Sequence, residues 1–218
     1  MKFFFLGAAL LCSASALPAV TSVTDGTFFN WSFSSVGAGS MTVDGANGNP
    51  ASGLNVTTTT AFTSDFVYGI GVDLNFSTAE ALSGIFSLGL DVKSGAGDFG
   101  SGQAVSLIVK QGSDLYSEIL GTTNYPHTNF DTLTFSGTFN PAFFTHVAGS
   151  GSGEPDFSGG TTTLFGFAGI NSNNGRTLTE YYDNYNLTYG AAPEPSTVVL
   201  GGLAFAGLCL FSRHRTIA

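Results

Sequence analysis

Charged residues are scarce in this sequence, and cysteine is nearly missing. Only 10% of the 218 residues are charged, and the two cysteines, Cys12 and Cys209, lie close to the two ends of the chain. Surface helices normally carry Glu, Lys and Arg on their solvent side, so this composition disfavours a helical domain. Without thiols the middle of the chain has no disulfide and no thiolate zinc site, and it must be stabilised by its own apolar core.

Basic residues are the rarest of the charged ones. There are six Lys and Arg against 15 Asp and Glu, and three of the six, Lys2, Arg213 and Arg215, lie in the terminal segments. Binding of a phosphate backbone requires clustered Lys and Arg. We therefore expect no nucleic-acid partner.

Glycine and aromatic residues are abundant instead, with 30 Gly and 21 Phe. From Phe66 to Phe76 every even-numbered residue is large and apolar, which predicts a strand with one buried face. Similar alternation occurs in residues 86–92 and 132–139, and Gly- and Asn-rich turns separate such segments. About eight strands without a helical period predict an all-β fold, a two-sheet antiparallel β-sandwich of the jelly-roll type, over residues 17–190.

The N-terminus has the three parts of a secretory signal peptide. Lys2 precedes an apolar run, residues 3–12, and the small residues up to Ala14 and Ala16 follow. This order indicates export and cleavage by signal peptidase after Ala16, with residues 1–16 removed. The alternative interpretation is a buried N-terminal helix.

The C-terminus also consists of three consecutive parts. Pro193, Glu194 and Pro195 come first, residues 198–211 carry no charge, and Arg213 and Arg215 follow. At about 1.5 Å per residue the apolar run is a helix of roughly 21 Å, a short membrane span. The basic residues predict that the extreme C-terminus stays in the cytoplasm while the domain lies outside.

This ending closely resembles the PEP-CTERM sorting signal, which we assign to residues 191–218. The resemblance implies processing by an exosortase, a membrane enzyme of Gram-negative bacteria that make exopolysaccharide, with Pro193, Glu194 and Pro195 as the recognition element. It also implies a precursor held transiently at the inner membrane and a product at the cell surface or in the extracellular matrix. The alternative is a tail anchor that is never cut.

A second, more distant resemblance concerns the middle of the chain. The segments 25–28, 48–50 and 182–187 look like landmarks of carbohydrate-binding-module-like jelly rolls. Such domains often hold a structural calcium ion, and on this analogy Asp25 and Asp183 would be its ligands. Asn184 stands where the family usually has a second acid, and a solvated edge strand is the alternative interpretation.

Three tyrosines near the end of the domain, Tyr181, Tyr185 and Tyr189, are spaced so that strict alternation puts them on one side of a strand. Aromatic faces pair with the apolar C–H patches of sugar rings, so this stripe is a candidate glycan-binding platform. Core packing explains the same spacing.

No motif in the sequence supports catalysis. Glu154 and Asp156 begin like the acidic strand of some sandwich-fold glycosidases, but position 159 is Gly. We therefore expect a non-catalytic, exported surface or matrix protein, structural or weakly glycan-binding, that is associated with exopolysaccharide or biofilm. The alternatives are a secreted polysaccharide-active hydrolase and a protein-binding adhesin.

Overall fold

The computed structural model shows an all-β arrangement in the part of the chain that it describes. Regular structure there consists of antiparallel strands and two single-turn 3₁₀ helices. The described residues are 20–49, 53–59, 65–97, 103–123, 127–151, 153–172 and 176–191.

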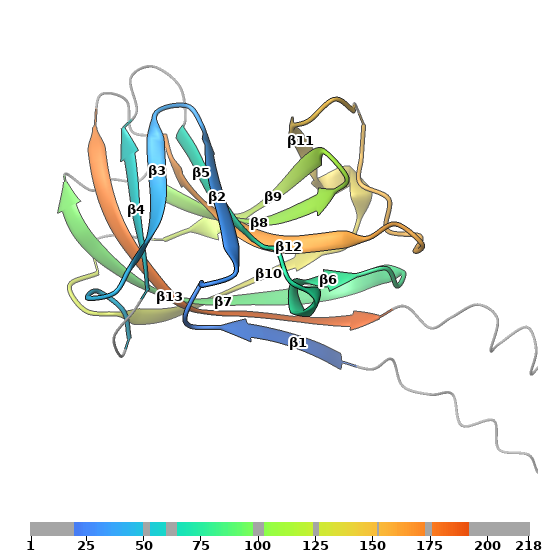
Figure 1. Ribbon diagram of the computed structural model, residues 1–218, viewed down its shortest axis with the longest axis horizontal. Helices are drawn as coiled ribbons and strands as arrows, with labels where there is room; N and C mark the ends of the chain where they lie inside the picture. The colour runs from blue at the N-terminus through green and yellow to red at the C-terminus, as the bar shows by residue number, and fades with distance from the viewer. Residues whose placement is uncertain are drawn as a thin grey trace, which may run out of the picture. The chain divides into compact units, whose positions relative to one another are not determined.

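The strands form two sheets, which Figure 1 shows as layers. In the first sheet the order is β10 (Asp131–Thr138), β7 (Leu82–Gly97), β13 (Thr177–Ala191), β4 (Gly53–Thr59) and β3 (Gly39–Asp44). The strand β1 (Val20–Asp25) belongs to the same sheet and pairs with β13. In the second sheet the order is β11 (Thr145–Ala148), β9 (Asp114–Thr122), β8 (Gln103–Gln111), β12 (Thr163–Asn171), β5 (Asp65–Gly71) and β2 (Trp31–Val36), with β6 (Ser77–Thr78) on the end of β12.

The predicted all-β, two-sheet antiparallel sandwich is confirmed. The chain passes repeatedly from one sheet to the other, so apart from the consecutive pairs β3–β4 and β8–β9 the neighbouring strands within each described sheet are not consecutive in sequence. The strands β1, β3, β9 and β11 were not among those predicted, because their sequences lack a clean apolar alternation.

A cluster of aromatic rings fills the space between the sheets. Trp31 lies at its centre, with T-shaped contacts at 5.1 Å to Phe28, 5.2 Å to Phe76 and 5.0 Å to Tyr185. Phe28 and Tyr185 are fully buried. Such pairs add about 0.5–1.5 kcal/mol each to the stabilisation that burial of their area provides.

The apolar alternation on β5 faces away from this core. Register pairs Ile70 with Gly166, and Tyr68 with Ala168, on the outer side of the second sheet. The inner side of β5 carries Gly69, where an added Cβ would lie 2.9 Å from the Trp31 ring. The glycines between the large residues therefore make room for core rings, and the large residues form a second apolar surface.

The strand predicted for residues 66–76 is also shorter than expected. β5 ends at Gly71, and the chain then forms the 3₁₀ helix η1 (Leu74–Phe76). The Asp73 carboxylate caps this helix by accepting a hydrogen bond from the Asn75 backbone N–H at 2.9 Å. The turn brings Phe76 into the core and leaves Leu74 exposed.

The predicted export and sorting signals lie elsewhere in the chain. The signal peptide with Lys2, Ala14 and Ala16, and the sorting segment with its motif at 193–195 and its basic residues Arg213 and Arg215, lie outside the described residues. Within the described ranges, no helix has the length and apolarity needed to cross a membrane.

A candidate glycan-binding groove

The outer face of the second sheet carries apolar side chains that are buried although they point away from the core. Ile108 on β8 and Ala168 on β12 are fully buried, and Ile70 on β5 and Leu115 on β9 are nearly so. They form a second hydrophobic cluster, separate from the core between the sheets. An outer sheet face is normally polar when it faces water, so a surface of this kind is a candidate binding site.

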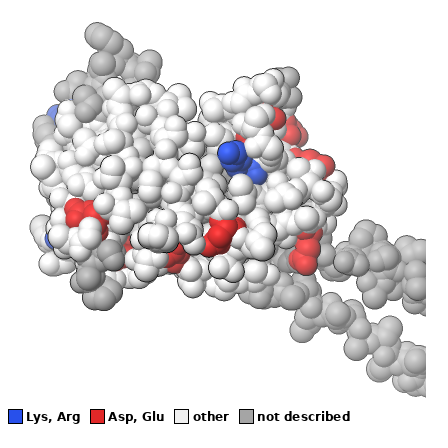
Figure 2. Space-filling model, in the orientation of Figure 1, with Lys and Arg blue, Asp and Glu red and all other residues white. Residues whose placement is uncertain are grey.

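This face is concave. In Figure 1 the strands β2 and β5 rise on one side and β11 on the other, while β8 and β12 lie lower between them. Figure 2 shows the molecular surface hollowed between the same two sides. The curvature explains why outward side chains on the middle strands are buried, because the flanking strands enclose them.

A cavity of about 400 Å³ opens on this face, which is enough for a small ligand. We call it the groove. Its lining comes from four strands and a 3₁₀ helix, η2 (Pro141–Phe143), and consists of Phe66, Ser117, Ile119, Phe143, Thr145, Val147 and Ile170.

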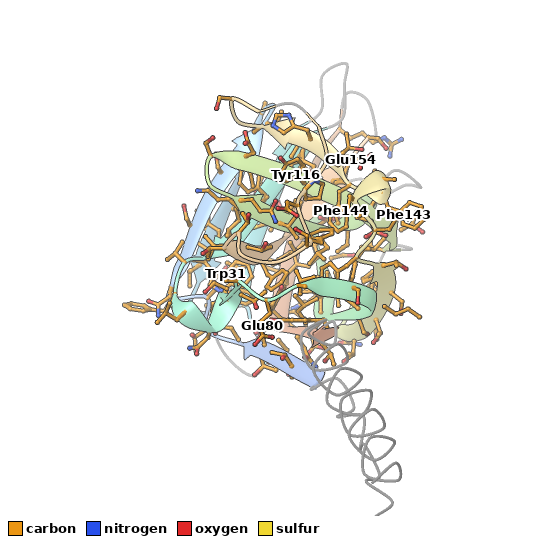
Figure 3. All side chains as sticks on the ribbon, turned by 90° about the vertical axis from the view of Figure 1, so that its right-hand side faces the viewer. Trp31, Glu80, Tyr116, Phe143, Phe144 and Glu154 are labelled. Carbon is orange, nitrogen blue, oxygen red and sulfur yellow. The ribbon has the colours of Figure 1, made fainter. Side chains whose placement is uncertain are left out.

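Phe143 supplies the most accessible aromatic ring of the groove. The helix η2 begins with Pro141 after Asn140, whose side chain accepts a hydrogen bond from the Ala142 backbone N–H at 3.2 Å. This turn orients neighbouring residues oppositely: Phe144 is buried, while Phe143 is 56% exposed and lies at the outer edge of the molecule in Figure 3. A ring held in that position is available to a ligand.

Two serine hydroxyls lie on the floor of this concave face. Ser117 pairs with Ile108, and Ser106 pairs with Ile119 one step along the same side of the two strands. Ser117 is 5% exposed and Ser106 is fully buried. Neither hydroxyl has a hydrogen-bond partner within the described part of the chain. A buried hydroxyl without a partner costs about 1–3 kcal/mol. Of the two residues Ser117 belongs to the described lining of the groove and Ser106 does not, so Ser117 is the candidate contact for a ligand.

The groove is nearly neutral. Its lining, in the part of the chain that the structure describes, contains no charged side chain. Lys110 belongs to the same sheet face, paired with Leu115 and Leu164 one row away from Ser117. In Figure 2 acidic side chains are scattered over the visible surface and basic ones appear only at separate points. The geometry fits an uncharged ligand.

The wall formed by β11 is held against β9 by contacts behind the groove. The ring of His146 packs edge-on against Tyr116 at 5.4 Å, and its Nε2 lies 3.5 Å from the Asp114 carboxylate. The hydrogen bond that the Gly151 backbone N–H donates, together with His146, holds the pKa of Asp114 below its ordinary value. These contacts position Thr145 at the groove.

The tyrosine stripe proposed from the sequence does not form. Tyr185 and Tyr189 are buried in the core, whereas Tyr181 is partly exposed beside Lys93. The reason is a β-bulge on β13, where Asn184 has a φ of 50° and the register with β7 shifts. One extra residue reverses the side on which later residues lie, so the expected spacing of four fails across the bulge.

Asp25 caps its own turn. Its Oδ1 accepts hydrogen bonds from the Thr27 backbone N–H at 2.6 Å, the Thr27 hydroxyl at 2.8 Å and the Phe28 backbone N–H at 3.2 Å. Its Oδ2 accepts one from Trp31 Nε1 at 3.0 Å. The side chain thereby fixes the loop that brings Phe28 and Trp31 into the core, and little of its ligand capacity remains for a metal ion.

The surroundings of Asp183 resemble a cation-binding site more closely than those of Asp25 do. It is buried, as is Asp91 opposite it on β7, and it accepts hydrogen bonds from the backbone N–H groups of Asn49 and Asn184. Burial raises the pKa of Asp183, and the charges of Asp91 and Asp25 add to that rise. The donor set fits calcium at Asp183 better than at the Asp25 carboxylate.

Asp91 is itself held by neutral donors. Its Oδ2 accepts from the amides of Asn49 at 2.9 Å and Asn184 at 2.7 Å, and its Oδ1 from the Thr132 hydroxyl at 2.6 Å. No group of three or more metal-binding side chains with suitable geometry occurs among the described residues. The calcium ion stays a prediction.

The carboxylates considered for hydrolysis lie apart from the groove. Asp156 accepts hydrogen bonds from the Ser158 backbone N–H at 2.9 Å and hydroxyl at 2.6 Å, which lower its pKa, and Glu154 is exposed on the same loop, as Figure 3 shows. Neither residue lines the groove. Glycoside hydrolysis uses two carboxyls on opposite sides of one bond, and the described lining of the groove provides none.

Comparison with known proteins gave matches among solved structures alone. No family model matches the sequence, and no curated protein does. The described fold is similar to the family 11 carbohydrate-binding module of a cellulosomal cellulase of Clostridium thermocellum, with a TM-score of 0.48 and 15% identity over 79% of this chain and 96% of that one.

Two xylan-binding modules are similar to a comparable degree. The family 22 xylan-binding domain from Paenibacillus barcinonensis has a TM-score of 0.41 and 14% identity over 80% of this chain and 94% of that one. The xylan-binding module CBM15 has a TM-score of 0.44 and 15% identity over 80% and 99%. At these scores the similarity says nothing of the ligand of this chain.

Proposed function

We propose that this chain is an exported, non-catalytic glycan-binding protein of the cell envelope that associates with exopolysaccharide. The groove on the outer face of the second sheet is the observation that carries the proposal. It combines an exposed ring, Phe143, with apolar walls and with the Ser117 hydroxyl, which lacks a partner in the described part of the chain.

These features match the chemistry of a sugar chain. A sugar ring has apolar C–H faces that stack on aromatic or aliphatic surfaces, and hydroxyls that bond to polar side chains. The uncharged lining and the net charge of −9 favour a neutral polysaccharide over an acidic one, because like charges repel. The absence of carboxylates from the described lining supports binding without hydrolysis.

Calorimetric titration of the domain with soluble neutral polysaccharides tests this proposal, and xylan and mixed-linkage β-glucan are suitable probes. We expect weak binding that Phe143→Ala reduces about tenfold, the loss of roughly 1.4 kcal/mol from one stacked ring. Phe29→Ala is the matched control, since Phe29 is 87% exposed and does not line the groove.

The same titration separates the alternatives. Equal effects of the two substitutions, or no heat with any neutral glycan, would contradict a glycan site in the groove. Release of reducing sugar ends during incubation would instead favour the hydrolase, and capture of a defined surface protein without glycan would favour the adhesin.

Export and sorting belong to the same proposal, supported by the residue order at both ends of the chain. Signal peptidase removes residues 1–16, and an exosortase recognises Pro193, Glu194 and Pro195 in the tail. Fractionation of cells with and without the exosortase tests this step. We expect a shorter, surface-associated form that is lost without the enzyme and in a Glu194→Ala variant, whereas an unchanged product would refute it.

A further inference from the structure

The walls of the groove match the C–H faces of a sugar ring better than its hydroxyl groups. Ile119, Val147 and Ile170 supply aliphatic surface, and the polar lining consists of the hydroxyls of Ser117 and Thr145. Each sugar hydroxyl placed against an aliphatic wall loses its hydrogen bonds to water without replacement, which disfavours binding. The walls instead match a ligand that carries apolar substituents.

The buried hydroxyls define what that substituent must contain. Ser117 and Ser106 are at least nine-tenths buried, point to the concave side, and have no hydrogen-bond partner among the described residues. Their neighbours on the sheet face are Ile108, Ile119 and Ala168, which provide neither donor nor acceptor from the side chain. A ligand group with one acceptor oxygen next to a methyl suits this environment. The oxygen accepts a hydrogen bond from the serine hydroxyl, and the methyl contacts the aliphatic neighbours.

We propose that the groove recognises O-acetyl groups on a neutral polysaccharide, a specificity that rests on the glycan-binding function proposed above. The ester carbonyl oxygen accepts a hydrogen bond from the Ser117 hydroxyl, and the acetyl methyl packs against Ile119 and Ile170. Phe143 at the rim stacks on the sugar ring that bears the ester.

Charge and hydrogen-bonding capacity exclude the nearest competing groups. A uronic acid carboxylate would enter a cavity whose described lining has no cation, and burial of an unpaired charge is strongly unfavourable. An N-acetyl group presents an additional N–H donor, for which the side chains of the described lining offer two hydroxyl acceptors, Ser117 and Thr145, and no carboxylate or amide. An ester carbonyl needs one donor and brings no donor of its own, and the Ser117 hydroxyl supplies that donor.

One polysaccharide in two chemical forms provides the experiment. Naturally acetylated xylan is compared with the same xylan after alkaline removal of its esters, and acetylated and de-esterified glucomannan form a second pair. We expect the acetylated forms to bind at least tenfold more tightly in calorimetric titration with the complete mature domain.

The outcomes distinguish the two proposals. Equal affinity for the acetylated and de-esterified forms overturns the acetyl specificity and leaves glycan binding intact. Absence of binding to all four polysaccharides overturns both. Tighter binding to N-acetylglucosamine oligomers than to acetylated xylan also overturns the assignment, because the amide would then be the recognised group.

The substitution Ser117→Ala tests the residue itself. Acetylated xylan should bind this variant about tenfold more weakly, down to the affinity of the de-esterified form, while binding of the latter is unchanged. Removal of a buried hydroxyl without a partner does not weaken the fold, so the urea midpoint should stay constant or rise. Ser136→Ala, on the outer face of the first sheet, is the control and should change neither affinity.

Discussion

The two sheets of this protein present opposite chemistry on their outer faces. Across the first sheet, register aligns a row of hydroxyl residues from four neighbouring strands, Ser136, Ser87, Thr188 and Ser22. Across the second sheet the equivalent positions include Ile108, Ile70 and Ala168. Both inner faces are apolar, as a sandwich core requires, so among the described residues the second sheet has a hydrophobic cluster on each of its sides. Folding explains the inner faces, and the proposed glycan binding accounts for the outer apolar face.

The largest effect is expected from a substitution that removes the space for rings on the inner side of β5. An added Cβ at Gly71 would lie 2.1 Å from Cγ of Phe76, so Gly71→Ala displaces this ring from its contact with Trp31. We expect a loss of about 3 kcal/mol in the free energy of unfolding, measured by urea denaturation. Gly45→Ala is the control, because nothing lies within 4 Å of its Cβ position; a similar loss there would show that the inner side of β5 is not tightly packed.

A charge placed on either outer face gives the second largest effect. Ile119 and Ile85 are exposed to similar extents, 67% and 73%, but Ile119 lines the groove and Ile85 lies on the first sheet. Ile119→Lys should abolish binding of a neutral polysaccharide in calorimetric titration, while Ile85→Lys should leave it unchanged. Equal loss in the two variants would mean that the two faces do not differ in function.

A smaller effect is expected for the pH dependence of stability, which involves the buried carboxyls Asp91 and Asp183 on the neighbouring strands β7 and β13. Because burial raises the pKa of Asp183, the folded protein binds this proton more tightly than the unfolded chain does. Its contribution to stability is therefore fully present below about pH 4 and is lost as the pH rises through the raised pKa. The melting temperature of the wild type should fall over this range more than that of Asp183→Asn.

Addition of calcium tests whether Asp183 and its neighbours bind this ion. If the ion binds at Asp183, millimolar calcium at neutral pH should raise the melting temperature of the wild type and not of Asp183→Asn, and a chelator should reverse the rise. Asp156→Asn is the control, since Ser158 holds the pKa of Asp156 low and the hydrogen bonds described for the Asp156 carboxylate reach neither Asp91 nor Asp183. An unchanged wild-type melting temperature would contradict the calcium prediction.

The smallest effect is expected from a substitution on the outer face of the first sheet, where the hydroxyl residues lie. Thr134 is exposed on β10, opposite Gly89, so Thr134→Val should alter the free energy of unfolding by no more than about 0.5 kcal/mol. Polysaccharide affinity should not change. A measurable loss of binding would show that the first sheet also contributes to the site.

Alternation in the sequence predicted β5, β7 and β10 well, because these strands have large residues at many of their alternate positions. It did not predict which side of β5 faces the core. That depended on the rings of Trp31 and Phe33, which come from another strand and pack over Gly69. Glycine at every odd position from 69 to 71 was the signal that the small side could be the inner one.

The site was predicted least well. The tyrosine stripe assumed an unbroken period of two, and the bulge with Asn184 at positive φ broke it. Ser117, Ile119 and Phe143 were not singled out, because their sequence separation gives no indication that one cavity unites them. A binding site built from the outer face of a sheet depends on strand order, which pairs residues remote in sequence.

The sequence by itself determined the all-β class, the antiparallel sandwich and the core-forming character of its strands, because side-chain alternation is a local property of the chain. The tertiary structure decided which apolar face became the core and which became the groove, and it decided that Ser106 and Ser117 are buried without partners in the described part of the chain. Those outcomes depend on sheet curvature and on long-range register, for which the identity of neighbouring residues along the chain carries no signal.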